Sequence, residues 1–68
     1  MYGERLKGLR KDRKVPQQTL ADLVGIKIRG YQLYESETTE PNIKALIALA
    51  DFYDVSIDYL VGRTDAPK

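Results

Sequence analysis

The sequence predicts an all-α fold built from five short helices, and three observations support this. Apolar residues recur at spacings of three and four along most of the chain, which is the periodicity of helices with one buried face. No segment alternates apolar and polar residues in the way a half-buried strand does. Helix-breaking residues at Pro16, Gly25, Pro41 and Gly62 divide the pattern into segments of helical length. With 68 residues, the chain has room for one domain with one core.

The first helix is expected over residues 2–13. Tyr2, Leu6 and Leu9 recur at i, i+4 and i+7, and charged residues fill the positions between them. This spacing is typical of an amphipathic helix with one buried stripe and, here, a basic outer face.

The second helix is expected to begin at Gln17, because the ring and the missing N–H of Pro16 suit the start of a helix. Its inner face is formed by Leu20, Ala21, Leu23 and Val24. Gly25 is expected to end it in a left-handed conformation. A third helix should follow over residues 27–36, with Tyr31 and Tyr34 on its inner side. Gly30 costs this helix about 1 kcal/mol relative to Ala, and close packing against Ala21 is a candidate reason for it.

Asn42 is expected to cap a fourth helix over residues 43–53, directly after Pro41. Its wide apolar face consists of Ile43, Leu46, Ile47, Leu49, Ala50 and Tyr53. Ser56 should cap a short fifth helix that contains Ile57, Leu60 and Val61 and is closed by Gly62. The polar residues 63–68 are predicted to form a flexible tail.

The composition argues against an enzyme, a metal site and a cofactor. The chain has neither cysteine nor histidine, so the usual zinc ligands and nucleophile–base pairs are missing, and 68 residues leave little room for a substrate cleft. No apolar run approaches 18 residues, and the charged N-terminus does not resemble a secretory signal, so we expect a cytoplasmic protein without a membrane span. No small-molecule ligand is indicated.

Charge is unevenly distributed although the net charge is only +1. Residues 1–14 carry six cations and two anions, whereas residues 35–55 carry one cation and five anions. A basic end of this kind can face the phosphates of a nucleic acid, and an acidic end cannot. The alternative is that the charged first helix is merely solvated.

Five sequence pieces in a fixed order resemble those of a known family. They are GERLKGLRKDRK, Q-x-x-LA-x-x-x-GI, YQ-x-YE, EPNIKALIALADFYDVS and DYLVGRTD, and together they cover essentially the whole chain. The chain resembles the lambda-repressor/Cro-type helix-turn-helix (XRE) family, most of all its small regulators from prophages and mobile elements. The resemblance implies a five-helix lambda-repressor-like DNA-binding domain over residues 1–62, with the helix-turn-helix at about 17–36.

The resemblance also implies roles for individual residues. Base contacts are expected from Lys27, Ile28, Arg29, Gln32 and Leu33. Phosphate contacts are expected from Gln17, Gln18, Thr38, Thr39 and Lys44. Arg10 and Glu35 match a pair that ties the first helix to the recognition helix. Arg29 and Gln32 have the chemistry to read guanine and adenine respectively, although both could be ordinary solvent-facing residues.

The implied function is a sequence-specific transcriptional regulator, expected to be a repressor, that binds a palindromic operator in double-stranded DNA as a homodimer. Its dimer surface is expected at Tyr59, Leu60 and Val61. The chain departs from the family pattern at the cap positions Pro16 and Lys27 and in the turn Glu37-Thr38-Thr39, so modest affinity is expected. The alternative is a protein-interaction module of the same fold, such as an anti-repressor or toxin partner, that uses Ile28 and Leu33. Whether these residues form a full-length regulator or the front domain of a longer one is open.

Overall fold

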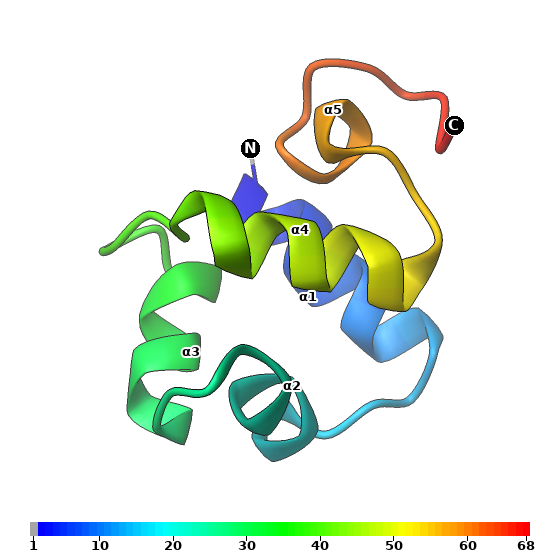
Figure 1. Ribbon diagram of the computed structural model, residues 1–68. Helices are drawn as coiled ribbons and strands as arrows, with labels where there is room; N and C mark the ends of the chain where they lie inside the picture. Colours follow the sequence, from blue (N-terminus) through cyan, green and yellow to red (C-terminus); the bar gives the residue numbers. More distant parts are fainter. Residues whose placement is uncertain (1) are drawn as a thin grey trace.

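A computed structural model describes residues 2–68, and five α-helices account for its regular structure (Figure 1). They are α1 (Tyr2–Asp12), α2 (Gln17–Val24), α3 (Ile28–Glu35), α4 (Ile43–Tyr53) and α5 (Ile57–Leu60). The prediction of an all-α fold of five helices is confirmed, and the predicted ends of the helices lie within one residue of those observed. No helix within residues 2–68 is both long and apolar enough to cross a membrane.

The helices surround one core. α2 packs against α3 and α4, α1 packs against α3 and α5, and α4 packs against α5. Figure 1 shows α4 across the middle of the molecule, with α2 and α5 at opposite ends. The buried core residues are Leu6, Leu20, Ala21, Tyr31, Tyr34, Ala45, Leu49, Ala50, Tyr53 and Leu60. Every helix contributes at least one of them, so no helix can be removed without exposing the core.

Local signals act at the helix ends as the sequence predicts. Gly25 ends α2 in the left-handed conformation (φ 77°, ψ 33°), and the next N–H, of Ile26, reaches back to the Ala21 carbonyl (3.0 Å). The side chain of Asn42 accepts a hydrogen bond from the Ala45 N–H (2.8 Å) and begins α4. Ser56 begins α5 in the same way through the Tyr59 N–H. These caps are the reason that the helix bounds follow from the sequence so closely.

Expectations about packing are wrong in α2, in α4 and at Gly30. Leu23 was expected on the inner face of α2 but is 41% exposed, whereas Leu20 and Ala21 are buried. Ile43 and Ile47 were expected on the buried face of α4 but are 74% and 46% exposed. On a helix of 3.6 residues per turn, Ile43 and Ile47 lie roughly 20° and 60° beyond the buried Ala50, at the edge of the buried face. The apolar face of α4 is therefore wider than the part of it that the neighbouring helices cover.

The last of these errors concerns Gly30. A Cβ at this position would lie 3.3 Å from Ile26 Cδ1 in the turn before α3, and Ala21 is not among its near neighbours. The close approach is therefore between the start of α3 and the turn that precedes it.

Residues 63–68 lie against the fold in this structure. The Ser56 N–H donates to the Pro67 carbonyl (2.7 Å), Arg5 contacts the Thr64 carbonyl and the Asp65 carboxylate, and Lys68 pairs with Asp54. The ion pairs of Asp65 and Lys68 are largely exposed and contribute little. The flexibility of this segment stays a prediction.

Candidate nucleic-acid interface

α3 has one face in the core and one face outside it. Tyr31 and Tyr34 are 0% and 9% exposed, and their rings meet edge to face at 6.2 Å, so their expected place in the core is confirmed. The outer face carries Ile28, Arg29, Gln32 and Leu33, and Lys27 stands at the residue before the helix. Lys27, Ile28 and Arg29 are exposed, whereas Gln32 and Leu33 are half-buried. The five residues predicted to contact bases therefore share one side of α3.

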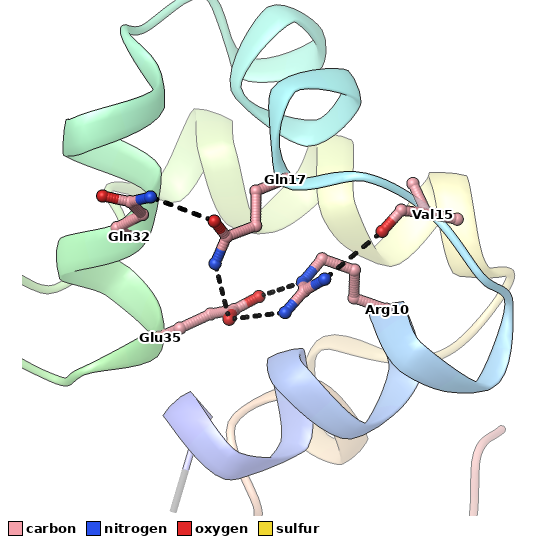
Figure 2. A network of polar contacts seen from close by, with 5 residues as sticks. All are labelled: Arg10, Val15, Gln17, Gln32 and Glu35. Atoms are coloured by element: carbon pink, nitrogen blue, oxygen red, sulfur yellow. Dashed lines mark hydrogen bonds and ion pairs between the residues drawn. The ribbon is translucent and has the colours of Figure 1, made fainter.

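An ion pair joins α3 to α1. Arg10 Nε donates to Glu35 Oε2 (2.7 Å), Arg10 Nη2 donates to Glu35 Oε1 (3.2 Å), and Arg10 Nη1 reaches the Val15 carbonyl (3.4 Å) (Figure 2). The side chains of Arg10 and Glu35 are only 14% and 6% exposed. A two-point contact of this kind fixes direction as well as distance. The predicted contact between these two residues is present, and it holds the last turn of α3 against α1.

The surroundings of Glu35 keep it ionised. Burial alone would raise the pKa of its carboxyl, but hydrogen bonds from Arg10 and Gln17, with a contribution from the nearby Tyr31 hydroxyl, hold the pKa below its ordinary value. The net shift is in the opposite direction for the phenols beside it, because burial raises the pKa of Tyr31 far above its usual range and that of Tyr53 to about 12. At neutral pH this cluster is therefore one carboxylate, one guanidinium and two neutral phenols.

Gln17 extends the network from Glu35 to the outer face of α3. Its Nε2 donates to Glu35 Oε1 (3.3 Å), and its Oε1 accepts a hydrogen bond from Gln32 Nε2 (3.1 Å). Figure 2 shows the Gln17 amide between the other two side chains, with the Gln32 nitrogen turned toward it and the Gln32 oxygen turned away. Sequence reasoning assigned Gln17 and Gln32 to separate tasks and missed this contact, since 15 residues separate them.

The Gln17 side chain is therefore directed toward α3, and this changes how its expected phosphate contact can arise. Pro16 gives no side-chain cap to α2, so the first N–H groups of this helix remain suited to an anion. The neighbouring Gln18 side chain is exposed and donates to Asp22 Oδ1 (2.9 Å) along α2. The backbone of the first turn, more than either amide, is what this end of α2 offers to a phosphate.

The remaining predicted phosphate contacts lie in the connection between α3 and α4 and in the first turn of α4. Thr38, Thr39 and Lys44 are all exposed. The Thr38 hydroxyl lies 2.9 Å from that of Ser36, and the Thr39 carbonyl accepts a hydrogen bond from the Tyr2 hydroxyl (3.0 Å). The backbone of the loop is thus held to α1 at Thr39, and the hydroxyl of Thr38 contacts that of Ser36.

Glu37 has a structural role that sequence reasoning missed. Its backbone is left-handed (φ 63°), and its Oε2 accepts the Gly3 N–H in the first turn of α1 (3.0 Å). A carboxylate at a helix N-terminus satisfies an otherwise unpaired N–H and complements the helix dipole. Because its partner lies 34 residues away, no local pattern signals it. The acidic residue in this turn is committed to α1.

The basic residues of α1 and of the turn after it divide into two groups. Arg5 stacks on the Tyr59 ring (3.9 Å), Arg10 pairs with Glu35, and Arg13 donates to the Tyr53 carbonyl (3.3 Å). Lys7, Lys11 and Lys14 are exposed. The three arginines therefore contact other parts of the fold, and the exposed positive charge of this segment comes from the lysines and from Arg13, which is also exposed.

One of the three residues expected at a dimer surface is misplaced. Leu60 is completely buried in the core of its own chain, so it offers no surface to a second copy. Tyr59 and Val61 are half-buried, and Ile57 on the same short helix is 38% exposed. Leu60 and Ile57 are three residues apart, so both were expected on the same apolar side of α5. The packing of α5 against α4 and α1 buries Leu60 and leaves Ile57 partly exposed.

A family model described as "Helix-turn-helix" matches residues 6–60. The chain belongs to the helix-turn-helix family of the lambda-repressor/Cro (XRE) type. It is 45% identical over 67 residues to the uncharacterized HTH-type transcriptional regulator YobD of Bacillus subtilis, covering 98% of this chain and 60% of that protein. The chain thus spans less than two thirds of the length of this relative.

Two solved structures have the same fold. A transcriptional regulator from Listeria innocua superposes with a TM-score of 0.88 at 35% identity, over 91% of this chain and 58% of that one. The P22 c2 repressor in complex with a synthetic operator superposes with a TM-score of 0.82 at 36% identity, over 90% and 92%. The relatives named here are transcriptional regulators or repressors, in agreement with the prediction that the chain is not an enzyme.

Proposed function

We propose that this chain is the DNA-binding part of a transcriptional repressor and reads an operator by placing α3 in the major groove. The observation that carries the proposal is the outer face of α3. It carries the exposed Arg29 and the half-buried Gln32 on a helix whose direction is held by the Arg10–Glu35 pair. A helix held in this way, with polar side chains that can reach base edges, meets the requirements of direct readout.

The similarity to the P22 c2 repressor supports the proposal, because that structure is a complex with a synthetic operator. The matched region covers nearly all of both chains, so the helix-turn-helix of this chain corresponds to a segment of an operator-bound protein. We infer that Gln17 and Gln18, through the start of α2, together with Thr38, Thr39 and Lys44, contact phosphates on either side of the groove.

We further propose that the protein binds a palindromic operator as a homodimer, with one α3 per half-site about one helical turn apart. Tyr59, Val61 and Ile57 are the surface residues near α5 that favour this location for the contact between copies. Sedimentation of the protein alone and of its DNA complex measures both stoichiometries. A single copy on every selected DNA would contradict this part of the proposal.

The decisive test is selection of bound duplexes from a random pool at about 50 mM salt, followed by titration of the selected sequence. We expect a conserved, two-fold symmetric site and an affinity that falls as salt rises, because phosphate contacts release counterions. The absence of any complex at micromolar protein would overturn the proposal.

A second candidate function is favoured by the apolar side chains on the reading side. Ile28 is 38% exposed and Leu33 is half-buried, and apolar groups of this size also suit a protein partner. In that case the selection would yield no DNA.

A further inference from the structure

The contact between Gln17 and Gln32 has a direction, and that direction follows from Glu35. An ionised carboxylate can only accept hydrogen bonds, whereas a glutamine amide has an oxygen that accepts and a nitrogen that donates. Glu35 therefore requires the Gln17 nitrogen to face it, as the 3.3 Å contact shows. The Gln17 oxygen must then face away from Glu35, toward Gln32.

The same reasoning fixes Gln32. Its partner is the Gln17 oxygen, which only accepts, so Gln32 must present its nitrogen to it (3.1 Å). The Gln32 oxygen is left on the opposite side of the amide, turned away from Gln17 in Figure 2. A free glutamine side chain can turn its amide over at little cost, but this one would then lose its hydrogen bond and face two oxygens toward each other.

Glu35, which sets the direction of these hydrogen bonds, is held firmly in place. Glu35 is held by two hydrogen bonds from Arg10, its side chain is 6% exposed, and its pKa lies below its ordinary value. It remains a carboxylate, and hence an acceptor, at any pH near neutrality. The chain of contacts from Arg10 through Glu35 and Gln17 thus sets which atom of Gln32 is presented on the outer face of α3.

We propose that this hydrogen-bond chain makes Gln32 present a carbonyl oxygen to the major groove, so that it selects a base with an exocyclic amine, adenine or cytosine, over guanine or thymine. In the major groove adenine N6 and cytosine N4 donate, whereas guanine O6 and thymine O4 accept. Gln17 then acts as a positioning residue that determines specificity without touching a base. The inference rests on the proposed function, since it names the base class that α3 reads.

The two amine bases differ in what lies beside the amine. Adenine offers the N7 acceptor next to N6, so it can also use the second N–H of the Gln32 amide, the one not engaged by Gln17. Cytosine offers no such acceptor. Adenine is therefore expected to be preferred over cytosine wherever that second N–H can reach N7.

The test compares base preferences of four purified proteins in a random-pool selection: the wild type, Gln32→Met, Gln17→Met and Gln17→Lys. Gln32→Met identifies the base position that Gln32 reads, because the preference there is lost. At that position we expect the wild type to favour adenine or cytosine by about tenfold. Gln17→Met frees the Gln32 amide to turn over, so the preference should fall to about twofold or less, while preferences at other positions stay as they are.

Gln17→Lys is the sharper variant. Its ammonium group donates to Glu35 and can donate to the Gln32 oxygen as well, which would turn the Gln32 nitrogen outward. The preferred base should then change to guanine or thymine. The extra charge strengthens binding to all sequences alike, so the change of base is read separately from affinity. Thermal melting of each variant checks that it is folded.

The outcomes separate the inference from the proposed function. If the wild type selects no DNA, both fail. If it selects DNA but favours guanine or thymine at the position that Gln32→Met identifies, the assigned direction is wrong. If Gln32→Met changes no base preference, or if both Gln17 variants retain the wild-type preference, the inference is overturned while DNA binding stands.

Discussion

Gly3 in the first turn of α1 lies directly against the end of α3 at Glu35. A Cβ at Gly3 would lie 2.6 Å from Glu37 Cγ and closer still to the backbone carbonyl oxygen of Glu35. The absence of a side chain is therefore what allows α1 to approach α3 closely enough for the Arg10–Glu35 pair to form. Backbone cannot move aside as a flexible side chain can, so this position accepts no other residue without separating the helices.

We expect Gly3→Ala to lower the free energy of unfolding by about 1–3 kcal/mol, as overpacking does. Gly8→Ala is the matched control on the same helix, because nothing lies within 4 Å of the position of its Cβ. That variant should gain about 1 kcal/mol from better helix propensity. Urea unfolding followed by circular dichroism measures both values. Equal effects of the two substitutions would contradict the close approach.

Arg10→Met should destabilise the domain strongly, because it leaves the Glu35 carboxylate buried without its main partner. Removal of one member of a buried pair costs about 3–5 kcal/mol, whereas replacement of both by apolar residues is often neutral. The double variant Arg10→Met, Glu35→Leu should therefore recover most of the lost stability, measured by thermal melting. We also expect it to bind DNA less specifically, since the direction of α3 and of Gln17 would be lost. A double variant no more stable than Arg10→Met would refute this account.

Stability should fall in acid partly through Glu35. Its pKa in the folded protein is below the ordinary value of 4.5, so the unfolded chain binds the proton first as pH decreases. The contribution of Glu35 is then complete above about pH 4.5 and is lost as pH falls through the lower pKa of the folded state. Unfolding free energies measured between pH 7 and pH 2 should show this loss. In Glu35→Gln, which cannot titrate, the dependence on pH below 4.5 should be shallower; an unchanged slope would exclude Glu35 as a cause.

Lys14 closes α1 in a left-handed conformation (φ 56°), with the Val15 N–H bonded to the Arg10 carbonyl (3.0 Å). This conformation costs a residue with a Cβ about 1–2 kcal/mol. Glycine avoids that cost, but it loses more conformational entropy on folding, which offsets part of the gain. Lys14→Gly should therefore raise the unfolding free energy by about 0.5–1 kcal/mol. Lys14→Ala removes the same charge without relieving the conformation and should give no such gain. Chemical denaturation of both variants provides the comparison.

Arg29 and Lys44 should respond differently in DNA binding. Arg29→Ala is expected to relax the preference at one base pair per half-site and to cost about 1–3 kcal/mol on the selected site. Lys44→Ala should weaken binding to all sequences alike and reduce the salt dependence by about one ion. Titrations of the selected site and of a scrambled duplex at several salt concentrations distinguish the two. Uniform weakening by Arg29→Ala would make it a phosphate contact.

Much of this protein follows from the sequence alone, and the reason is that the signals are local. Helix periodicity, the Asn42 and Ser56 caps and the left-handed Gly25 act within one or two turns, so the five helices and their ends could be predicted. The pairing of Arg10 with Glu35 could be predicted only from the resemblance to the family, because the spacing of the two residues in the sequence does not indicate it.

What only the tertiary structure decided depends on which faces other helices cover and which distant side chains meet. The sequence shows that Ile43, Ile47 and Leu60 are apolar, but it does not show which of them are buried. The packing of the helices leaves the two isoleucines exposed and buries Leu60. The capping of α1 by Glu37 and the contact of Gln17 with Gln32 join residues 34 and 15 positions apart. Hydrogen bonds have a direction only once both partners are in place, so the orientation of Gln32 on the face of α3 could come from the folded structure and not from its neighbours in the sequence.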